Sequence, residues 1–407
     1  MTAKLYKNNF ASLSTKQLRL LTELLEYACQ SLELSESKRE RVEKSYQSVG
    51  EWLAKSEDKI FDNAEIYPQG SQRIGTTTKP PFRAEFDLDF ICFLPNAEHI
   101  HPDECRRKVI DRLKENGNYD GLVSELNRGC RINYADNFHL DITPGIPDQN
   151  NANEYGAISV PDKKLKAWKA SNPKGYAEDF DIIANMVPAY SDEKDFRYAT
   201  ASMESINVED LPKHQVFKGI LRRAVQIMKR HRDLLFHEDE QYQGKAPISI
   251  ILTTLASRAY RDAVTNQLYG NELEVLLTVV ESMTSYIETK VVDSRIEIWV
   301  TNPKNEHENF AEKWNVDAKR VEAFHYWHTN FVDKLRELAS VQSLPLIRKK
   351  LDQLIGEKPS EAAVDKHFEF INESRAENKL FVAKTGAISV AATTTPVKAN
   401  TFFGKLL

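Results

Sequence analysis

The chain has 407 residues, and 55 Lys and Arg against 60 Asp and Glu give a formal net charge of −5. This balance provides no global attraction to nucleic acid, and no apolar run approaches the ~20 residues that span a membrane. The four cysteines are scattered without a C-x-x-C pair, which argues against a zinc site and a disulfide framework and favours the reducing cytoplasm.

The first half of the chain mixes helical and strand periodicity, as expected of an α/β protein of one large two-lobed unit or two domains. Apolar residues at helical spacing, with a proline at the start of the third segment, predict helices. The predicted elements are helices over 15–31, 36–55 and 102–114, strands over 62–67 and 130–134, and a surface loop over 145–163.

The stretch from Tyr67 to Leu94 combines a turn with an acidic strand. A glycine such as Gly70 lets the backbone approach a ligand closely, and the N–H groups and hydroxyl at Ser71 suit a phosphate. Asp87 and Asp89 share one face of a strand whose other face is apolar. Two close carboxylates repel each other unless a cation lies between them, and oxygen-only ligands suit Mg²⁺, or Mn²⁺ as a substitute.

A third acid follows in Phe-His-Leu-Asp-Ile at 138–142, where alternation puts Asp141 on the polar face of a second half-buried strand. Phosphoryl transfer with two metal ions needs about three carboxylates to hold both ions roughly 4 Å apart. The turn, the D-L-D strand and the later aspartate together predict a nucleotidyltransferase, although a surface turn with solvated acids is the alternative for each part alone.

The second half is predicted to be mainly helical. The helix over 213–235 is strongly basic on its polar side, and another helix opens at Ser249. Further helices are expected over 271–290 and 309–339 and in two shorter segments up to about 375, with a strand over 295–301. From about residue 384, small residues, threonines and a proline predict an extended tail.

These motifs resemble the DNA polymerase β-like nucleotidyltransferase superfamily and, within it, the bacterial cGAS/DncV-like nucleotidyltransferases of anti-phage (CBASS) operons. PQGSQRIGTTTKP and EFDLDFICFL are similar to that family's opening motifs, and FHLDITP is similar to its third-acid strand. Further landmarks are residues 171–176, Asn302-Pro303 and 308–310. The resemblance covers roughly residues 40–340.

The resemblance implies a bilobed polymerase β-like fold, in which a small mixed sheet carries the acids and a mainly helical lobe closes the cleft. The expected division is 1–212 for the N-terminal helices and catalytic lobe, 213–375 for the helical lobe, and 376–407 for the tail. It further implies that Lys229 and Ser249 contact the donor triphosphate, with a surface lysine as the alternative for Lys229. The family's usual base-stacking tyrosine is replaced by Ile250.

The implied activity joins nucleoside triphosphates into a cyclic di- or trinucleotide messenger and releases pyrophosphate, with two Mg²⁺ ions held by Asp87, Asp89 and Asp141. Regulatory or effector proteins from a defence operon are the implied partners, without stable nucleic acid or membrane binding. The alternatives are an RNA-directed enzyme, an enzyme that adenylylates a protein or small molecule, and a catalytically dead binding scaffold. The net charge argues against the first, and the intact acid triad against the last.

Overall fold

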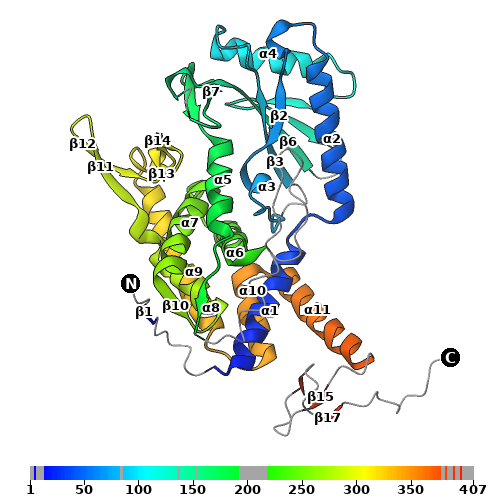
Figure 1. The fold of residues 1–407 in the computed structure, drawn as a ribbon, viewed down its shortest axis with the longest axis vertical. Coiled ribbons are helices and arrows are strands. Elements are labelled where there is room, and N and C mark those ends of the chain that lie inside the picture. Colours follow the sequence, from blue (N-terminus) through cyan, green and yellow to red (C-terminus); the bar gives the residue numbers. More distant parts are fainter. Residues whose placement is uncertain are drawn as a thin grey trace, which may run out of the picture.

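The structure is a computed structural model, and it describes residues 4–5, 13–82, 86–134, 138–151, 154–191, 218–376, 381–382, 388–389 and 395–396. Figure 1 shows an upper lobe built on a sheet and a lower lobe built of helices, joined around α3 (Gly70–Arg73) and α5 (Pro173–Ala184). The bilobed mixed architecture confirms the predicted fold class.

The upper lobe contains a mixed sheet in the order β2-β3-β6-β5-β4, to which β7 and β8 add beyond β6. Its two central strands, β3 and β6, run parallel to each other, while the remaining pairs are antiparallel. The strands are β2 Glu65–Pro68, β3 Phe86–Phe93, β4 Val123–Glu125, β5 Cys130–Tyr134, β6 Phe138–Pro147, β7 Ile158–Asp162 and β8 Ala167–Ser171.

One face of this sheet is covered by α2 (Glu36–Ala54) and α4 (Pro102–Lys114). Phe86, Leu88 and Phe90 of β3 are buried there, and Tyr46 of α2 stacks on the Phe90 ring with centroids 4.6 Å apart. Because side chains alternate along a strand, the aspartates of β3 lie on the other face. The apolar core therefore fixes which way the acids point.

The helical lobe forms a second core that includes α1 (Thr15–Ser31) and α5 as well as the later helices. The N-terminus of α1 is fixed by a capping box, in which Ser14 accepts from the Gln17 N–H and donates its own N–H to the Gln17 side chain. The later helices are α6 Gly219–Leu235, α7 Ser249–Asn266, α8 Glu272–Ser282, α9 Lys319–Leu338, α10 Leu344–Ile355 and α11 Glu357–Ala376.

Several predicted elements are confirmed, among them the helices over 15–31, 36–55 and 102–114. The loop expected over 145–163 is wrong in part, because β6 continues to Pro147 and β7 pairs antiparallel with β6 and β8. The helices expected over 271–290 and 309–339 are both too long. The first ends at Ser282 and the second begins at Lys319, because the hairpins β11–β12 and β13–β14 occupy the intervening chain.

These hairpins are β11 Glu288–Val292 with β12 Arg295–Trp299, and β13 Thr301–Asn302 with β14 Asn305–Asn309. A small parallel sheet joins β1 Lys4–Leu5, β10 Gln267–Tyr269 and β9 Ala189–Tyr190. The start expected at residue 213 for the basic helix lies outside the described residues. Of the predicted tail, only three short antiparallel strands are described, at 381–382, 388–389 and 395–396.

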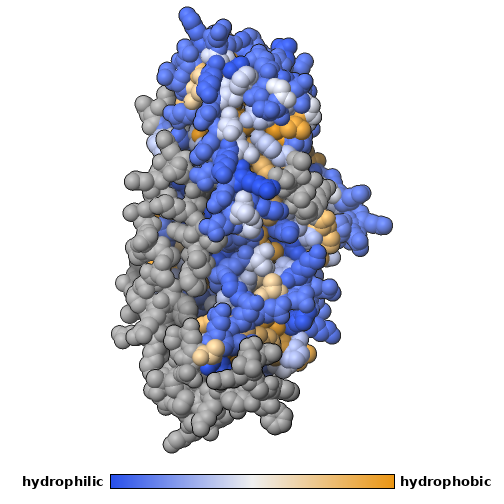
Figure 2. Space-filling view, turned by 90° about the vertical axis from the view of Figure 1, so that its right-hand side faces the viewer, coloured by the Kyte–Doolittle hydropathy of each residue, from blue (hydrophilic) through white to orange (hydrophobic). Residues whose placement is uncertain are grey.

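Figure 2 shows a face on which hydrophilic residues predominate and hydrophobic residues form small, separate groups. Among the described helices, none combines the length and apolar character needed to cross a bilayer.

The division of the chain into units after residues 212 and 375 stays a prediction.

Candidate active site

The three predicted acids come together on the sheet face that turns away from α2 and α4. The parallel register of β3 and β6 pairs Asp89 directly with Asp141, and Asp87 with His139. The Asp87 side chain is 62% exposed, whereas that of Asp141 is 15% exposed. The structure thus brings the three carboxylates to the middle of two adjacent strands, with Asp87 at the open end.

The glycine of the predicted turn lies against the acids. Gly70 has φ +58°, and a Cβ added there would lie 2.9 Å from Oδ2 of Asp89. Both the left-handed backbone and the close approach therefore require glycine at this position. The preceding Gln69 donates its N–H to the Asp89 carbonyl at 2.8 Å, which ties the turn to β3. Ser71 follows in α3, so the predicted phosphate-binding turn directly adjoins the acid cluster.

Burial and the neighbouring carboxylates dominate the electrostatics of Asp89. The pKa of Asp89 is raised to about 6, mainly by burial and then by the negative charges of Asp141 and Asp87. The charges of Lys229 and Arg131 oppose this shift but do not cancel it. A bound divalent cation would reverse the balance, and the oxygen-only donor set is the one that Mg²⁺ and Mn²⁺ prefer. The residues present therefore fit such an ion.

A fourth side chain, which the sequence analysis did not single out, occupies the cluster. Arg131 of β5 is the register partner of Asp141 and donates to it twice, from Nε to Oδ1 at 2.7 Å and from Nη2 to Oδ2 at 2.8 Å. Its Nη2 also lies 3.0 Å from Oδ1 of Asp87. Among the described residues, no three Asp, Glu, His or Cys side chains are arranged to ligate one ion in this geometry.

Lys229 of α6 is buried, with 7% of its surface exposed, so the surface-lysine alternative is wrong. Its Nζ donates to the Thr76 carbonyl at 2.9 Å, a few residues after the Gly70–Ser71 turn. Burial, with a smaller contribution from Arg232, lowers the pKa of the amine to about 8, while Asp233 and Asp89 oppose the shift. The ammonium thus lies beside the acid cluster, and among the described residues its hydrogen-bond partner is the Thr76 carbonyl.

Lys229 belongs to a row of α6 side chains that bind backbone carbonyls of the segment 74–79. The row spans about two turns of the helix and reaches the segment that follows α3, which contains Gly70 and Ser71. It consists of Arg222 to Ile74 at 3.1 Å, Gln226 to Thr77 at 3.0 Å, Lys229 to Thr76, and Arg230 to Lys79 at 3.0 Å. The helical lobe therefore holds the segment that follows the Gly70–Ser71 turn through main-chain contacts, which no sequence motif predicts.

Ser249 is the first residue of α7, as predicted, and its hydroxyl accepts from Nη1 of Arg232 at 2.9 Å. Arg232 lies at the C-terminal end of α6 and also pairs with Asp233. Within the described part of the chain, Ser249 is thus joined to the basic helix and not to the acids.

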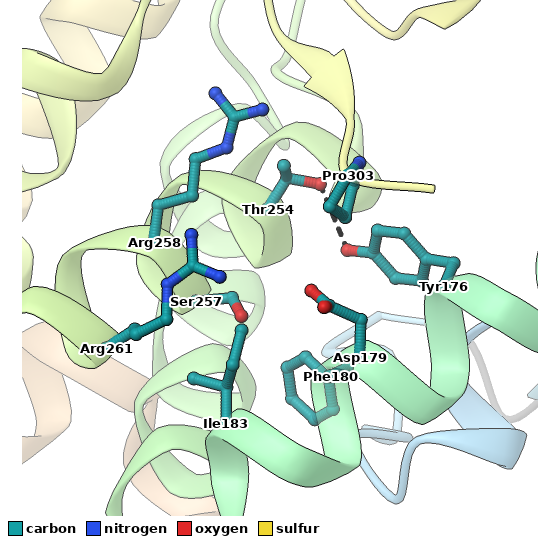
Figure 3. A pocket seen from close by; sticks show the side chains of 9 residues that line it. All are labelled: Tyr176, Asp179, Phe180, Ile183, Thr254, Ser257, Arg258, Arg261 and Pro303. Carbon is teal, nitrogen blue, oxygen red and sulfur yellow. Dashed lines mark hydrogen bonds between the residues drawn. The ribbon is translucent and has the colours of Figure 1, made fainter. Parts of the chain in front are cut away.

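A small pocket lies elsewhere, between α5, α7 and Pro303, and none of the predicted site residues lines it (Figure 3). Tyr176 and Thr254 close one side through a hydroxyl–hydroxyl hydrogen bond of 3.0 Å. Arg258 contributes a guanidinium that is already bound to Glu288 and to the Thr301 carbonyl. Through these contacts, Arg258 connects α7 to the two hairpins at the pocket.

The other sequence landmarks meet near this pocket. Asn172 caps α5 by accepting the Gly175 N–H at 2.9 Å, and its amide donates to the Lys304 carbonyl at 3.3 Å. Tyr176 meets Phe310 edge to face, with ring centroids 5.9 Å apart. These landmarks hold α5 against the β13–β14 hairpin and thus support the fold.

Residues 21–182 match the family described as Second Messenger Oligonucleotide or Dinucleotide Synthetase domain. The chain is 30% identical over 390 residues to the "c-di-GMP synthase" of Roseivirga ehrenbergii, covering 94% of this chain and 97% of that protein. The chain belongs to the cGAS/DncV-like nucleotidyltransferases. As a cGAS/DncV-like nucleotidyltransferase it is an enzyme that joins nucleoside triphosphates into a cyclic second messenger, and an anti-phage role fits the family.

Further relatives of this cGAS/DncV-like nucleotidyltransferase agree. The cyclic dinucleotide synthase CdnG of Bradyrhizobium diazoefficiens is 26% identical over 262 residues, or 61% of this chain and 59% of that protein. The structure of CdnG in complex with GTP aligns with a TM-score of 0.65 and 18% identity, over 86% of this chain and 99% of that chain. CdnC of E. coli MS115-1 with ATP aligns with a TM-score of 0.57 and 13% identity, over 82% and 97%. The family uses divalent metal ions.

Proposed function

We propose that Asp87, Asp89 and Asp141 are the catalytic carboxylates and the ligands of two Mg²⁺ ions, for which Mn²⁺ can substitute. The observation that carries this proposal is the register of β3 and β6, which pairs Asp89 with Asp141 directly beside Gly70. The raised pKa of Asp89 supports it, since a metal site without its cation leaves repelling carboxylates. When bound, the metal ions supply Lewis acidity and neutralise phosphate charge.

The reaction is the attack of a ribose hydroxyl oxygen on the α-phosphorus of a nucleoside triphosphate. An oxygen–phosphorus bond forms, the bond to the β-phosphate oxygen breaks, and pyrophosphate leaves with its electron pair. Asp141 accepts the hydroxyl proton and passes it to solvent. A second attack of the same kind closes the ring. Because little covalent chemistry falls to the protein, positioning and charge neutralisation carry the catalysis.

The phosphate end of the donor is assigned to Gly70, Ser71, Lys229 and Ser249. The Gly70–Ser71 turn offers backbone N–H groups and a hydroxyl beside the acids, and Lys229 offers an ammonium that can leave the Thr76 carbonyl for a stronger anionic partner. Ser249 is brought near the basic end of α6 by Arg232. The assignment predicts that all four bind β- and γ-phosphates.

The substrate assigned here is GTP, and the product cyclic di-GMP. The support is the 30% identity to the protein named "c-di-GMP synthase", which extends over 97% of that protein's length. The aliphatic Ile250 offers no ring on which a base could stack, so recognition of the guanine has to come from other side chains. Regulatory or effector partners from a defence operon and a cytoplasmic location stay predictions.

Incubation with each nucleoside triphosphate in turn tests the choice of substrate. The purified protein, with Mg²⁺ or Mn²⁺, is expected to convert α-labelled GTP alone into a phosphatase-resistant product that comigrates with cyclic di-GMP. ATP, CTP and UTP alone are expected to yield none. A product that forms only when a second nucleotide is present would contradict the assignment of GTP as the sole substrate while leaving the enzyme class intact.

A further inference from the structure

Arg131 lies where a cation is needed by the acid cluster. It stands on β5, whose neighbouring side chains Cys130 and Ile132 are buried in the core beneath the sheet. Alternation along the strand therefore puts the arginine on the same face as the acids. The antiparallel register sets it directly beside Asp141, so its place is fixed by the sheet rather than by a flexible loop.

The Arg131 guanidinium is bound to the carboxylate oxygens that would coordinate a metal ion. Its two donors engage both oxygens of Asp141, at 2.7 and 2.8 Å, and one of them also lies 3.0 Å from Oδ1 of Asp87. Such a bidentate pair is among the stronger hydrogen-bonded arrangements in proteins. A guanidinium is permanently charged and donates only, so it cannot itself become a metal ligand or accept the hydroxyl proton.

We propose that Arg131 is the internal counter-ion of the acid cluster, which occupies Asp141 and Asp87 until a metal ion displaces it. This inference rests on the proposed function of the three carboxylates. Arg131 acts through the acids and is a positioning residue. In the metal-free protein it offsets the repulsion between Asp87 on β3 and Asp141 on β6. In the absence of nucleotide, it also makes the affinity for a metal ion lower than that of the same three carboxylates without an arginine partner.

The test measures Mn²⁺ binding to the full chain without nucleotide, by electron paramagnetic resonance of the free ion. Arg131→Gln is expected to bind Mn²⁺ about ten- to a hundredfold more tightly than the wild type. The reason is that the metal ion no longer has to break charge-assisted hydrogen bonds in order to bind. Arg131→Lys keeps the charge but cannot cover both oxygens, and should bind a few times more tightly than the wild type. The matched control is Arg128→Gln, which removes an arginine 3.9 Å from Asp162 on the same part of the chain and is expected to change binding less than twofold.

Unchanged or weaker Mn²⁺ binding by Arg131→Gln would overturn the proposal, because the arginine would then only orient Asp141. Tighter binding by Arg131→Gln with wild-type binding by Arg131→Lys would also overturn it, since net charge rather than occupancy would be responsible. If the glutamine variant does not fold, Arg131→Lys alone decides. Asp89→Asn, measured in parallel, should lose Mn²⁺ binding. If it does not, the metal assignment itself fails, which is distinguishable from failure at Arg131.

Discussion

Replacement of Asp89 by asparagine is expected to abolish synthesis and at the same time to stabilise the metal-free protein. Activity should fall roughly 10²- to 10³-fold or more, as when one preorganised charge-stabilising group is removed. Stability should rise because the pKa of Asp89 is about 6 in the fold against an ordinary value of 3.8. The ionised form is thus disfavoured by folding, by at most about 3 kcal/mol.

The pH dependence of this effect has a definite sign. A carboxyl whose pKa is raised by folding costs the wild type stability as the pH rises from about 4 through about 6. Asp89→Asn should therefore melt above the wild type at pH 7 without metal, and the difference should vanish near pH 4. Asp87→Asn is the control, because Asp87 is exposed and paired with Arg131 and should gain no stability. Near-normal turnover in Asp89→Asn would refute the triad.

Replacement of Lys229 by methionine is expected to raise the KM for the nucleotide about ten- to a hundredfold. This is the loss of affinity expected when one charge-assisted hydrogen bond to a phosphate is removed. The fold should persist, because methionine fills much of the buried volume and leaves unpaired only the Thr76 carbonyl. Steady-state kinetics and a thermal melt on the same sample separate the two effects. An unchanged KM and rate would show that the ammonium serves only to hold the segment 74–79.

Gln226→Leu is the matched control for this comparison. It removes the α6 hydrogen bond to the Thr77 carbonyl at 3.0 Å, together with the hydrogen bonds of the same amide with Arg223 and Glu33, without removing a charge. If anchoring of the segment were the main role of α6, Gln226→Leu and Lys229→Met should raise the KM equally. The account predicts a clearly larger effect for Lys229→Met.

The acid cluster could be predicted from the sequence because it depends on local alternation. Asp87, Asp89 and Asp141 each alternate with apolar residues in strict period two. The acids therefore lie on the polar face of each half-buried strand, where neighbouring strands of one sheet can place them close together. Gly70 was also recognisable, because it precedes Ser71 in a turn a short distance ahead of the acidic strand. The structure adds the parallel register, which periodicity alone does not specify.

The contacts around the cluster could not be predicted in the same way. Arg131 lay in a predicted strand and on its polar face, but a lone arginine carries no sign of the strand beside which it will lie. The carbonyl contacts from α6 to 74–79 join segments about 150 residues apart and involve main-chain acceptors that every residue has. Strand β12 was predicted within 295–301, but its partner β11 was missed, because the helix expected over 271–290 extends into it. Val291 of β11 pairs across with Ile296 of β12.

The most direct test of the account is the identity of the product made from all four nucleoside triphosphates without primer or protein acceptor. Mass spectrometry of the wild-type reaction should find a small nucleotide with no terminal phosphate, accompanied by one pyrophosphate per nucleotide joined, and the Asp89→Asn reaction should lack it. Label that appears instead in long RNA or on a protein would contradict the central claim that this site closes a cyclic dinucleotide.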